Sequence, residues 1–191
     1  MTIKTKGIVL RAIRYNDTQE IHTLFTDELG LVSLITKTQK KENLPPLYEG
    51  EFVLKKGKNF FQLIEAKQTA FHHKIRESLD TIETAFKLIH VLLKSQMPLK
   101  SAPALYALFC AFLKQLPNIK NQRTLTAVFT AKLLFHEGHL DPDQPLLAKL
   151  ATVKSFSEID SFHLSEPEVK EMHLHFDQVY DFLLERKGAN R

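Results

Sequence analysis

Lysine side chains gather in two short stretches in the N-terminal third of this 191-residue chain. The first stretch contains Lys37, Lys40 and Lys41, and the second contains Lys55, Lys56 and Lys58. Both stretches are predicted loops, and loop lysines that converge on one face of a small β-barrel can neutralise nucleic-acid phosphates. The alternative is a pair of solvated loops that keep the protein soluble, and the residue pattern alone favours that alternative.

Net charge is concentrated in the same region. Residues 1–76 contain 13 Lys and Arg against 8 Asp and Glu, a net charge of +5, whereas the remainder contains 13 against 14. A basic excess on one module is what a phosphate-backbone partner requires, although many ordinary proteins share a pI near 9.1.

No arrangement of side chains predicts catalysis or metal binding. His136 and His139 flank Gly138, which we expect to end a helix, and His173 and His175 would diverge by about 200° on a helix. The sequence contains no Gly-rich phosphate loop, no G-x-S-x-G elbow and no H-E-x-x-H motif. We therefore expect no enzyme activity, no metal and no other cofactor.

Composition indicates a globular protein of one domain or two small ones, with 43% hydrophobic and 25% charged residues. The single cysteine, Cys110, lies on an apolar helix face, where we expect a buried, inert thiol. One cysteine cannot form an internal disulfide, so a reducing cytoplasm is favoured. No segment has the pattern of a signal peptide or a membrane span, so we expect neither secretion nor membrane insertion.

The hydrophobic pattern predicts the elements that must position the lysines. Between residues 6 and 63, apolar residues follow the two-residue period of strands. The expected strands cover residues 8–13, 21–25, 31–35, 51–54 and 59–66. Turn signals separate them, including Gly30 and the pair Pro45-Pro46. Five short strands predict a small closed or nearly closed barrel.

Aromatic residues near these strands have two interpretations. Tyr15, Tyr48, Phe60 and Phe61 can stack on bases, as in single-strand binders of the barrel class. Core packing is the commoner use, and strand alternation requires that Phe60 or Phe61 point inward.

Beyond about residue 71, the apolar residues follow the period of helices. Helices are expected over residues 82–93, 105–116, 125–133, 144–151 and 165–186. We therefore predict a barrel domain at 1–70 and an α-helical domain at 71–191. An apolar groove among the helices is a hypothetical site for an acidic partner segment. Four basic residues would lie at its rim: Lys114, Lys120, Arg123 and Lys132.

The N-terminal segment carries a family pattern. Thr5-Lys6-Gly7-Ile8-Val9-Leu10-Arg11 is followed by Tyr15 and then by Leu24-Phe25-Thr26-Asp27-Glu28-Leu29-Gly30-Leu31-Val32-Ser33. These residues and their spacing resemble the opening of the RecO DNA repair proteins. Weaker resemblance continues through residues 61–66, 104–109 and 133–138, so that it covers nearly the whole chain.

The resemblance implies an α+β fold, with a five-stranded barrel of the oligonucleotide-binding (OB) type followed by an α-helical domain. It implies a recombination mediator that binds single- and double-stranded DNA and anneals complementary strands. Such proteins engage the acidic C-terminal tail of single-strand-binding protein and work with RecR to load RecA, with RecF and RecA as indirect partners. The expected DNA contacts are Arg11, Arg14, Lys37, Lys40, Lys41, Lys55, Lys56 and Lys58.

Two features depart from the family pattern. Many members carry a four-cysteine zinc module after the helix that is expected to end at Gly138, and this chain has no cysteine there. Residues 37–43 contain lysine where the family is richer in arginine, which predicts weaker and more salt-sensitive DNA binding. The competing hypothesis is a partner-binding scaffold of the same fold that has lost DNA binding.

Overall fold

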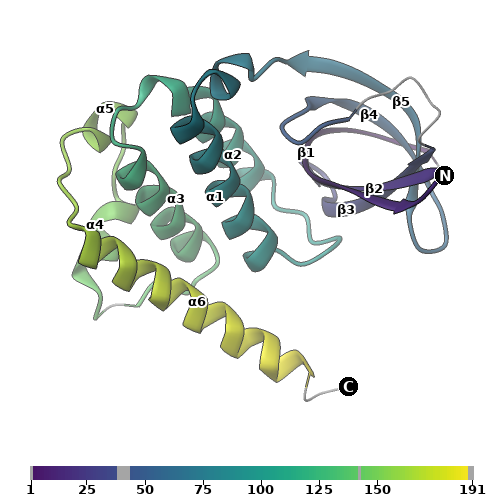
Figure 1. The fold of residues 1–191 in the computed structure, drawn as a ribbon. Helices are drawn as coiled ribbons and strands as arrows, with labels where there is room; N and C mark the ends of the chain where they lie inside the picture. The colour runs from purple at the N-terminus through teal and green to yellow at the C-terminus, as the bar shows by residue number, and fades with distance from the viewer. Residues whose placement is uncertain (1, 38–43, 142, 189–191) are drawn as a thin grey trace. The chain divides into compact units, whose positions relative to one another are not determined.

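The computed structural model describes residues 2–37, 44–141 and 143–188 and contains two compact units. The barrel unit contains Met1–His73 and Gln96–Leu108, and the helical unit contains Lys74–Ser95 and Phe109–Arg191. Five strands precede the α-helices along the chain (Figure 1), so the expected α+β class is confirmed. The division into domains at residue 70 stays a prediction.

A single sheet closes on itself in the barrel unit (Figure 1), with the strand order β1-β2-β3-β5-β4. The strands are β1 (Thr2–Asn16), β2 (Gln19–Thr26), β3 (Gly30–Lys37), β4 (Glu49–Lys56) and β5 (Phe61–Ala70). All neighbours are antiparallel except β3 and β5, which are parallel.

The long strand β1 joins the two ends of the strand order, because successive parts of it pair with different neighbours. Its N-terminal part pairs with β4 and its C-terminal part pairs with β2, and Gly7 lies opposite both Gly50 and Thr26. A register shift between Val9 and Arg11 marks a β-bulge, which bends the strand from one partner to the other.

Strand alternation fills the barrel with apolar side chains. The buried cluster consists of Val9, Leu24, Val32, Leu34, Leu44, Phe52, Leu54, Phe61 and Leu63. The residues between them along each strand face away from the barrel interior. Some of these, including Ile8, Leu10 and Phe25, are nevertheless buried, so only the remaining outward positions are open to a ligand.

Residues 96–108 complete the barrel unit beside the start of β3. The Leu99 backbone N–H donates to the carbonyl of Leu31 at 2.9 Å, and the Tyr106 ring packs at 5.8 Å from the Phe25 ring. Gly30 has a left-handed φ of +68°, and a Cβ there would lie 1.9 Å from the Lys100 carbonyl oxygen. The close approach therefore requires glycine for two separate reasons.

In the helical unit, the nearly fully buried helix α3 contacts both α1 and α6. The helices are α1 (Leu79–Ser95), α2 (Pro103–Gln115, which begins in the barrel unit), α3 (Gln122–His136), α4 (Pro145–Ala151), α5 (Phe156–Ile159) and α6 (Glu166–Gly188), with short 3-10 turns η1 (His73–Glu77) and η2 (Leu116–Asn118). Residues 124–131 of α3 are all buried, so this helix has an apolar environment all round rather than on the single face that its stripe predicted. Phe129 of α3 packs against Phe109 and Phe112.

Local signals set the helix ends. The Ser165 backbone N–H and hydroxyl both donate to the Glu168 carboxylate, at 2.7 and 2.6 Å, which caps the start of α6. These hydrogen bonds from Ser165 lower the pKa of Glu168. Gly138 has a φ of +75° just after α3, as expected for a C-terminal cap.

Replacement of Gly30 by alanine is expected to destabilise the protein more than replacement of Gly138. Both positions have a left-handed φ, which costs about 1–2 kcal/mol for a residue with a Cβ. Only Gly30 also faces a backbone clash, because nothing lies within 4 Å of a Cβ at Gly138. Thermal unfolding followed by circular dichroism measures both losses, and an equal loss would contradict the close approach at Lys100.

Candidate nucleic-acid interface

The predicted basic residues of the barrel lie mainly at strand ends. Lys37 is the last residue of β3, and Lys55 and Lys56 are the last residues of β4. The assignment of these three residues to loops was wrong, because β-pairing continues through them: Lys37 pairs with Gln19, Lys55 with Thr2 and Gln62, and Lys56 with Phe61. Lys58 does lie in the β4–β5 connection, and Lys40 and Lys41 lie outside the described residues.

Alternation separates the two lysines of β4. Leu54 points into the core, so Lys55 faces outward. By the same alternation, the Lys56 side chain would point inward, but it is exposed because the strand ends at this residue. The two ammonium groups therefore approach a ligand from different sides of the same strand end.

The same rule separates the two arginines of β1. Arg11 lies opposite Thr23 and Arg14 lies opposite Glu20, with an odd separation of three residues along the strand. They consequently occupy opposite faces of β1. Both are exposed, so each is available to solvent from its own face.

A row of outward-facing residues crosses the sheet. Ile13 lies opposite Ile21, Ile21 opposite Ile35, Ile35 opposite Gln62, and Gln62 opposite Lys55. Directly opposite residues have Cβ atoms about 4.5–5.5 Å apart, so these side chains form a continuous band. The three isoleucines are only half-buried or exposed, and they give the band an apolar end and a polar, basic end.

A groove of about 330 Å³ lies beside this band. Its lining residues are Gln19, Ile35, Thr36, Lys37, Gln62 and Leu63. Strands β3 and β5 are joined by two residue pairs only, Leu34 with Phe61 and Ile35 with Gln62, and the groove lies where that pairing ends. Lys37 lines the groove, and Lys55 is the cross-strand neighbour of Gln62, so the structure brings these two predicted residues together around Gln62.

Sequence reasoning missed the uncharged residues of the groove. Gln19, Ile35 and Gln62 carry no charge signal, and their only indication was an outward position in the alternation of three strands. An outward position alone does not show which residues share a groove. The strand pairing is also needed, because β3 and β5 are distant in sequence.

The four aromatic candidates divide into two pairs. Phe61 is buried in the barrel, and Tyr48 packs against the core with its ring at 5.8 Å from that of Phe52. Tyr15 and Phe60 instead lie at the surface, with ring centroids 6.4 Å apart. The expectation that one of Phe60 and Phe61 points inward is thus confirmed.

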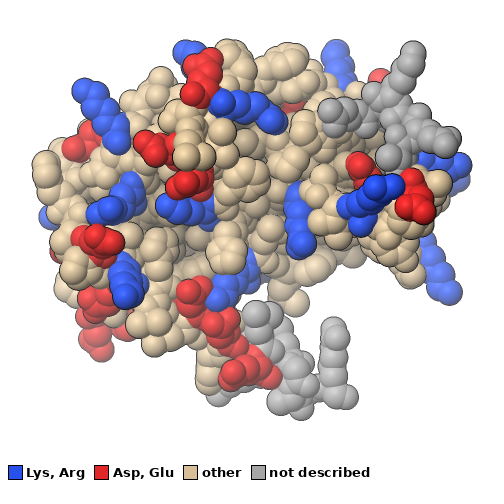
Figure 2. All heavy atoms as spheres, in the orientation of Figure 1, with Lys and Arg blue, Asp and Glu red and all other residues tan. Residues whose placement is uncertain are grey.

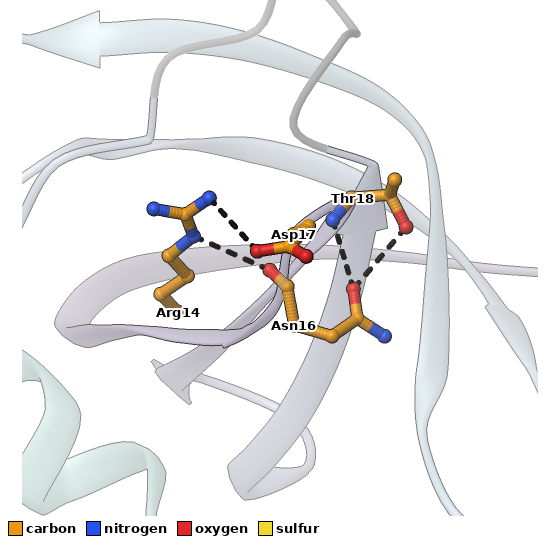
Figure 3. Close-up of polar contacts among 4 residues, drawn as sticks. All are labelled: Arg14, Asn16, Asp17 and Thr18. Carbon is orange, nitrogen blue, oxygen red and sulfur yellow. Dashed lines mark hydrogen bonds and ion pairs between the residues drawn. The ribbon is translucent and has the colours of Figure 1, made fainter.

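A hydrogen-bonded hairpin follows Tyr15 (Figure 3). The Asn16 side-chain oxygen accepts from the Thr18 backbone N–H at 2.9 Å and from its hydroxyl at 3.2 Å. The Arg14 guanidinium donates to Asp17 at 3.3 Å and to the Asn16 carbonyl at 3.4 Å. Arg14 therefore braces the turn, and its charge is partly offset by Asp17.

Beneath the groove, a buried histidine links β2 to β3. The His22 Nε2 atom lies 2.9 Å from the Thr36 hydroxyl and 3.6 Å from a Glu20 carboxylate oxygen. Burial lowers the pKa of His22, while Glu20 and a hydrogen bond with the backbone of Leu44 raise it less. The net lowered pKa favours the neutral ring in the folded protein.

In the helical unit, a groove of about 540 Å³ is formed by the N-terminal halves of α1, α3 and α6. Four basic side chains line it: Lys87, Lys120, Arg123 and Lys170. Asp80, Glu83 and Glu166 line it as well, so side chains of both charges line this groove. The apolar groove expected from the sequence stays a prediction. On the face shown in Figure 2, basic and acidic side chains are likewise interspersed over the helices.

The other two predicted partner residues do not line this groove. Lys114 is exposed in the last turn of α2. Lys132 is half-buried in α3, and its Nζ donates to the Ala151 carbonyl at 3.0 Å. Burial also lowers the pKa of Lys132, against the nearby Glu158, and the hydrogen bond to Ala151 gives this residue a structural contact.

The histidines and the cysteine have ordinary packing roles. The His136 ring faces Glu137 at 3.1 Å, the His139 ring packs on Tyr180, and Cys110 is half-buried rather than fully buried. Within the described ranges, no group of three or more His, Cys, Asp or Glu residues could hold a metal ion. Among the helices of those ranges, none has the length and apolar character needed to cross a membrane.

Comparison with known proteins identifies the barrel segment. Residues 1–72 match the family model for the recombination protein O N-terminal region, and β5 ends at Ala70, so the match contains the complete barrel sheet. A DNA repair protein RecO of Chlamydia pneumoniae is 31% identical over 148 residues, which cover 74% of this chain and 58% of that protein. These matches confirm the resemblance to the RecO family. The RecO protein of Salinibacter ruber is 30% identical over 132 residues, 63% of this chain and 49% of its own length. The RecO protein of Caldicellulosiruptor saccharolyticus is 28% identical over 143 residues, which cover 71% of this chain and 58% of that protein.

The chain aligns with about half to three fifths of the length of these relatives. The matched family region coincides with the barrel segment that carries the groove, the outward band and the ring pair of Tyr15 and Phe60.

The lowered pKa of His22 predicts a pH dependence of stability. An unfolded histidine titrates near pH 6.5, and the folded ring takes up its proton only at lower pH. The unfolded state therefore binds more protons as the pH falls below about 6.5, and the free energy of unfolding decreases. Urea unfolding between pH 7.5 and 5 measures this loss in the native chain and in His22→Gln. The variant should lose less stability over that range, and an identical loss would contradict the assignment to His22.

Proposed function

We propose that this chain acts in DNA repair and recombination and that its barrel binds DNA through the groove and the outward band. The observation that carries the proposal is the placement of Lys37 and Lys55 on either side of Gln62, on the outer face of a RecO N-terminal barrel. Small barrels of the OB class bind oligonucleotides on the face formed by their second and third strands, where this groove begins.

Both single- and double-stranded DNA fit the proposal, because phosphate contacts carry no base identity. Lys37, Lys55, Lys56, Lys58 and Arg11 supply positive charge from several strand ends, and the proposed contacts extend to Arg14, Lys40 and Lys41. Neutralising phosphates on two complementary strands lowers their mutual repulsion, which supports annealing. The action on DNA is physical binding, without any bond-breaking step.

Substitution of glutamate at both Lys37 and Lys55 is expected to weaken DNA binding and flatten its salt dependence. Each lost phosphate contact removes about 0.7 from the log–log salt slope for single strands, so loss of both lowers the slope by about 1.4. Fluorescence anisotropy of a labelled oligonucleotide at several salt concentrations gives this slope, and a strand-annealing assay reports the consequence.

The matched control carries glutamate at Lys67 and Lys74, two exposed lysines that do not line the groove. It undergoes the same change in net charge and should keep a slope close to that of the native chain. Equal effects of the two double variants would show that only net charge matters, and they would reject the groove as the interface.

The polar groove of the helical unit supports a second part of the proposal, binding of an acidic protein segment. In the RecO setting, the proposed segment is the C-terminal tail of single-strand-binding protein, and cooperation with RecR would then place RecA on the coated DNA. Lys120 and Arg123 line the groove beside Lys87 and Lys170. The Asp160 carboxylate holds the turn before α3 by accepting the backbone N–H groups of Lys120 and Asn121, at 3.0 and 2.9 Å.

Glutamate at both Lys120 and Arg123 is expected to weaken binding of the acidic tail peptide by roughly 2- to 30-fold, the effect of losing two exposed charge pairs. Isothermal titration with the synthetic peptide measures this loss, with Lys74→Glu/Lys154→Glu as the charge-matched control. Unchanged peptide binding would remove the groove from the proposal. If the native chain binds this peptide but no DNA, the scaffold hypothesis replaces the mediator hypothesis.

A further inference from the structure

Tyr15 and Phe60 form a surface pair that the phosphate contacts do not use. Tyr15 is the penultimate residue of β1, before the β1–β2 turn, and Phe60 ends the β4–β5 connection, 45 residues later in the chain. Their ring centroids are 6.4 Å apart with planes tilted by 57°, and Tyr15 is 59% exposed. A large aromatic ring with that exposure contributes little to the core of the barrel.

The local backbone directs Tyr15 to the surface. The β1–β2 register shifts between Arg14 and Asn16, so Tyr15 is the extra residue of a β-bulge. Bulges change the direction of a side chain and increase strand twist. Neither Asp17 nor Thr18 in the two-residue turn has a positive φ, so the turn itself does not supply the twist of the usual tight hairpins.

Both supports of the ring pair are ordered by short-range hydrogen bonds. On the Tyr15 side, Asn16 holds Thr18 and Arg14 holds Asp17 (Figure 3). On the Phe60 side, the Gly57 backbone N–H donates to the Phe60 carbonyl at 3.1 Å, and a Cβ at Gly57 would lie 2.4 Å from that oxygen. The two rings are thus positioned before any ligand arrives, which reduces the entropic cost of binding.

We propose that Tyr15 and Phe60 form a stacking platform for an unpaired nucleobase, so that the barrel favours single-stranded over double-stranded nucleic acid. The inference rests on the proposed nucleic-acid binding of the barrel and adds base stacking to it. Every nucleobase offers an aromatic face, whereas the bases of a duplex are already stacked on one another. Charge agrees with this ligand, because the exposed side chains of Lys56 and Lys58 lie on the β4–β5 hairpin that carries Phe60.

The absence of tryptophan from the chain makes a direct test possible. In the full-length Tyr15→Trp variant, the single indole should be quenched when oligo-dT is added. It should not be quenched by an abasic oligomer of equal length, which offers the same phosphates without bases. The control variant, Phe86→Trp, places an exposed indole in the helical unit and should show no quenching with either oligomer.

Affinity provides the second measurement. Tyr15→Leu should weaken binding of oligo-dT by roughly 5- to 150-fold, the range of one base–aromatic stack, and leave binding of the abasic oligomer and of duplex DNA unchanged. Tyr15→Phe keeps the ring and should bind oligo-dT like the native chain. Circular dichroism confirms that each variant is folded before titration.

The outcomes separate the two proposals. Binding of oligo-dT without quenching of Tyr15→Trp, together with normal affinity of Tyr15→Leu, overturns the stacking platform and leaves the phosphate interface in place. Equal losses for oligo-dT and the abasic oligomer in Tyr15→Leu also overturn it, because the residue then supports the backbone contacts. No binding of any nucleic acid by the native chain overturns both.

Discussion

Closure of the barrel depends on strand β1, which pairs with β4 along its N-terminal part and with β2 along its C-terminal part. Gly7 of this strand lies opposite Gly50 on one side and Thr26 on the other. A side chain at Gly7 would meet Thr26 and the Phe25 carbonyl at 3.2 and 3.3 Å, so the crossing point has little room. Because a closed sheet has no free edge, the inward and outward positions of every other strand are then fixed.

The candidate interface lies where the barrel sheet has its shortest strand pairing, between β3 and β5. β3 and β5 are joined by two residue pairs only, and the groove lies beside that short contact. The ends of β3 and β4 bring Lys37 and Lys55 to either side of Gln62, while the connections at the ends of β1 and β4 bring Tyr15 and Phe60 together. Phosphate contacts and base stacking would therefore use different parts of one barrel, which suits a ligand that has both a charged backbone and aromatic bases.

The helical unit presents a different kind of surface. Its central helix α3 is buried, and the ends of α1, α3 and α6 form a groove in which cations and carboxylates alternate. Burial also lowers the pKa of His173 in this groove. Asp177 raises this pKa, whereas Lys87 and His90 lower it further. A mixed groove selects a partner by the arrangement of its charges rather than by total charge, which differs from the sequence-independent phosphate contacts proposed for the barrel.

Sequence alone determined those properties that depend on residues close together in the chain. Alternation predicted five strands, helical periodicity predicted the later helices, and Ser165, Glu168 and Gly138 marked helix ends, because each signal acts within a few residues. The resemblance to the RecO family likewise rests on one continuous stretch, from Thr5 to Ser33, and the comparisons with known proteins confirm it. The predicted DNA contacts and the domain boundary at residue 70 stay predictions.

Only the tertiary structure decided which of these residues meet. Strand pairing placed Lys37, Lys55 and Lys56 at the ends of strands, and Lys37 lines the same groove as Gln62, which is 25 residues away in sequence. It separated Tyr15 and Phe60 from Tyr48 and Phe61, although all four are aromatic and close to strand ends. It also brought Lys120 and Arg123 into one groove with Lys87 and Lys170, and it placed Lys132 in contact with Ala151. The physical reason is that register between distant strands and packing between distant helices depend on the whole barrel or bundle, and no local period encodes them.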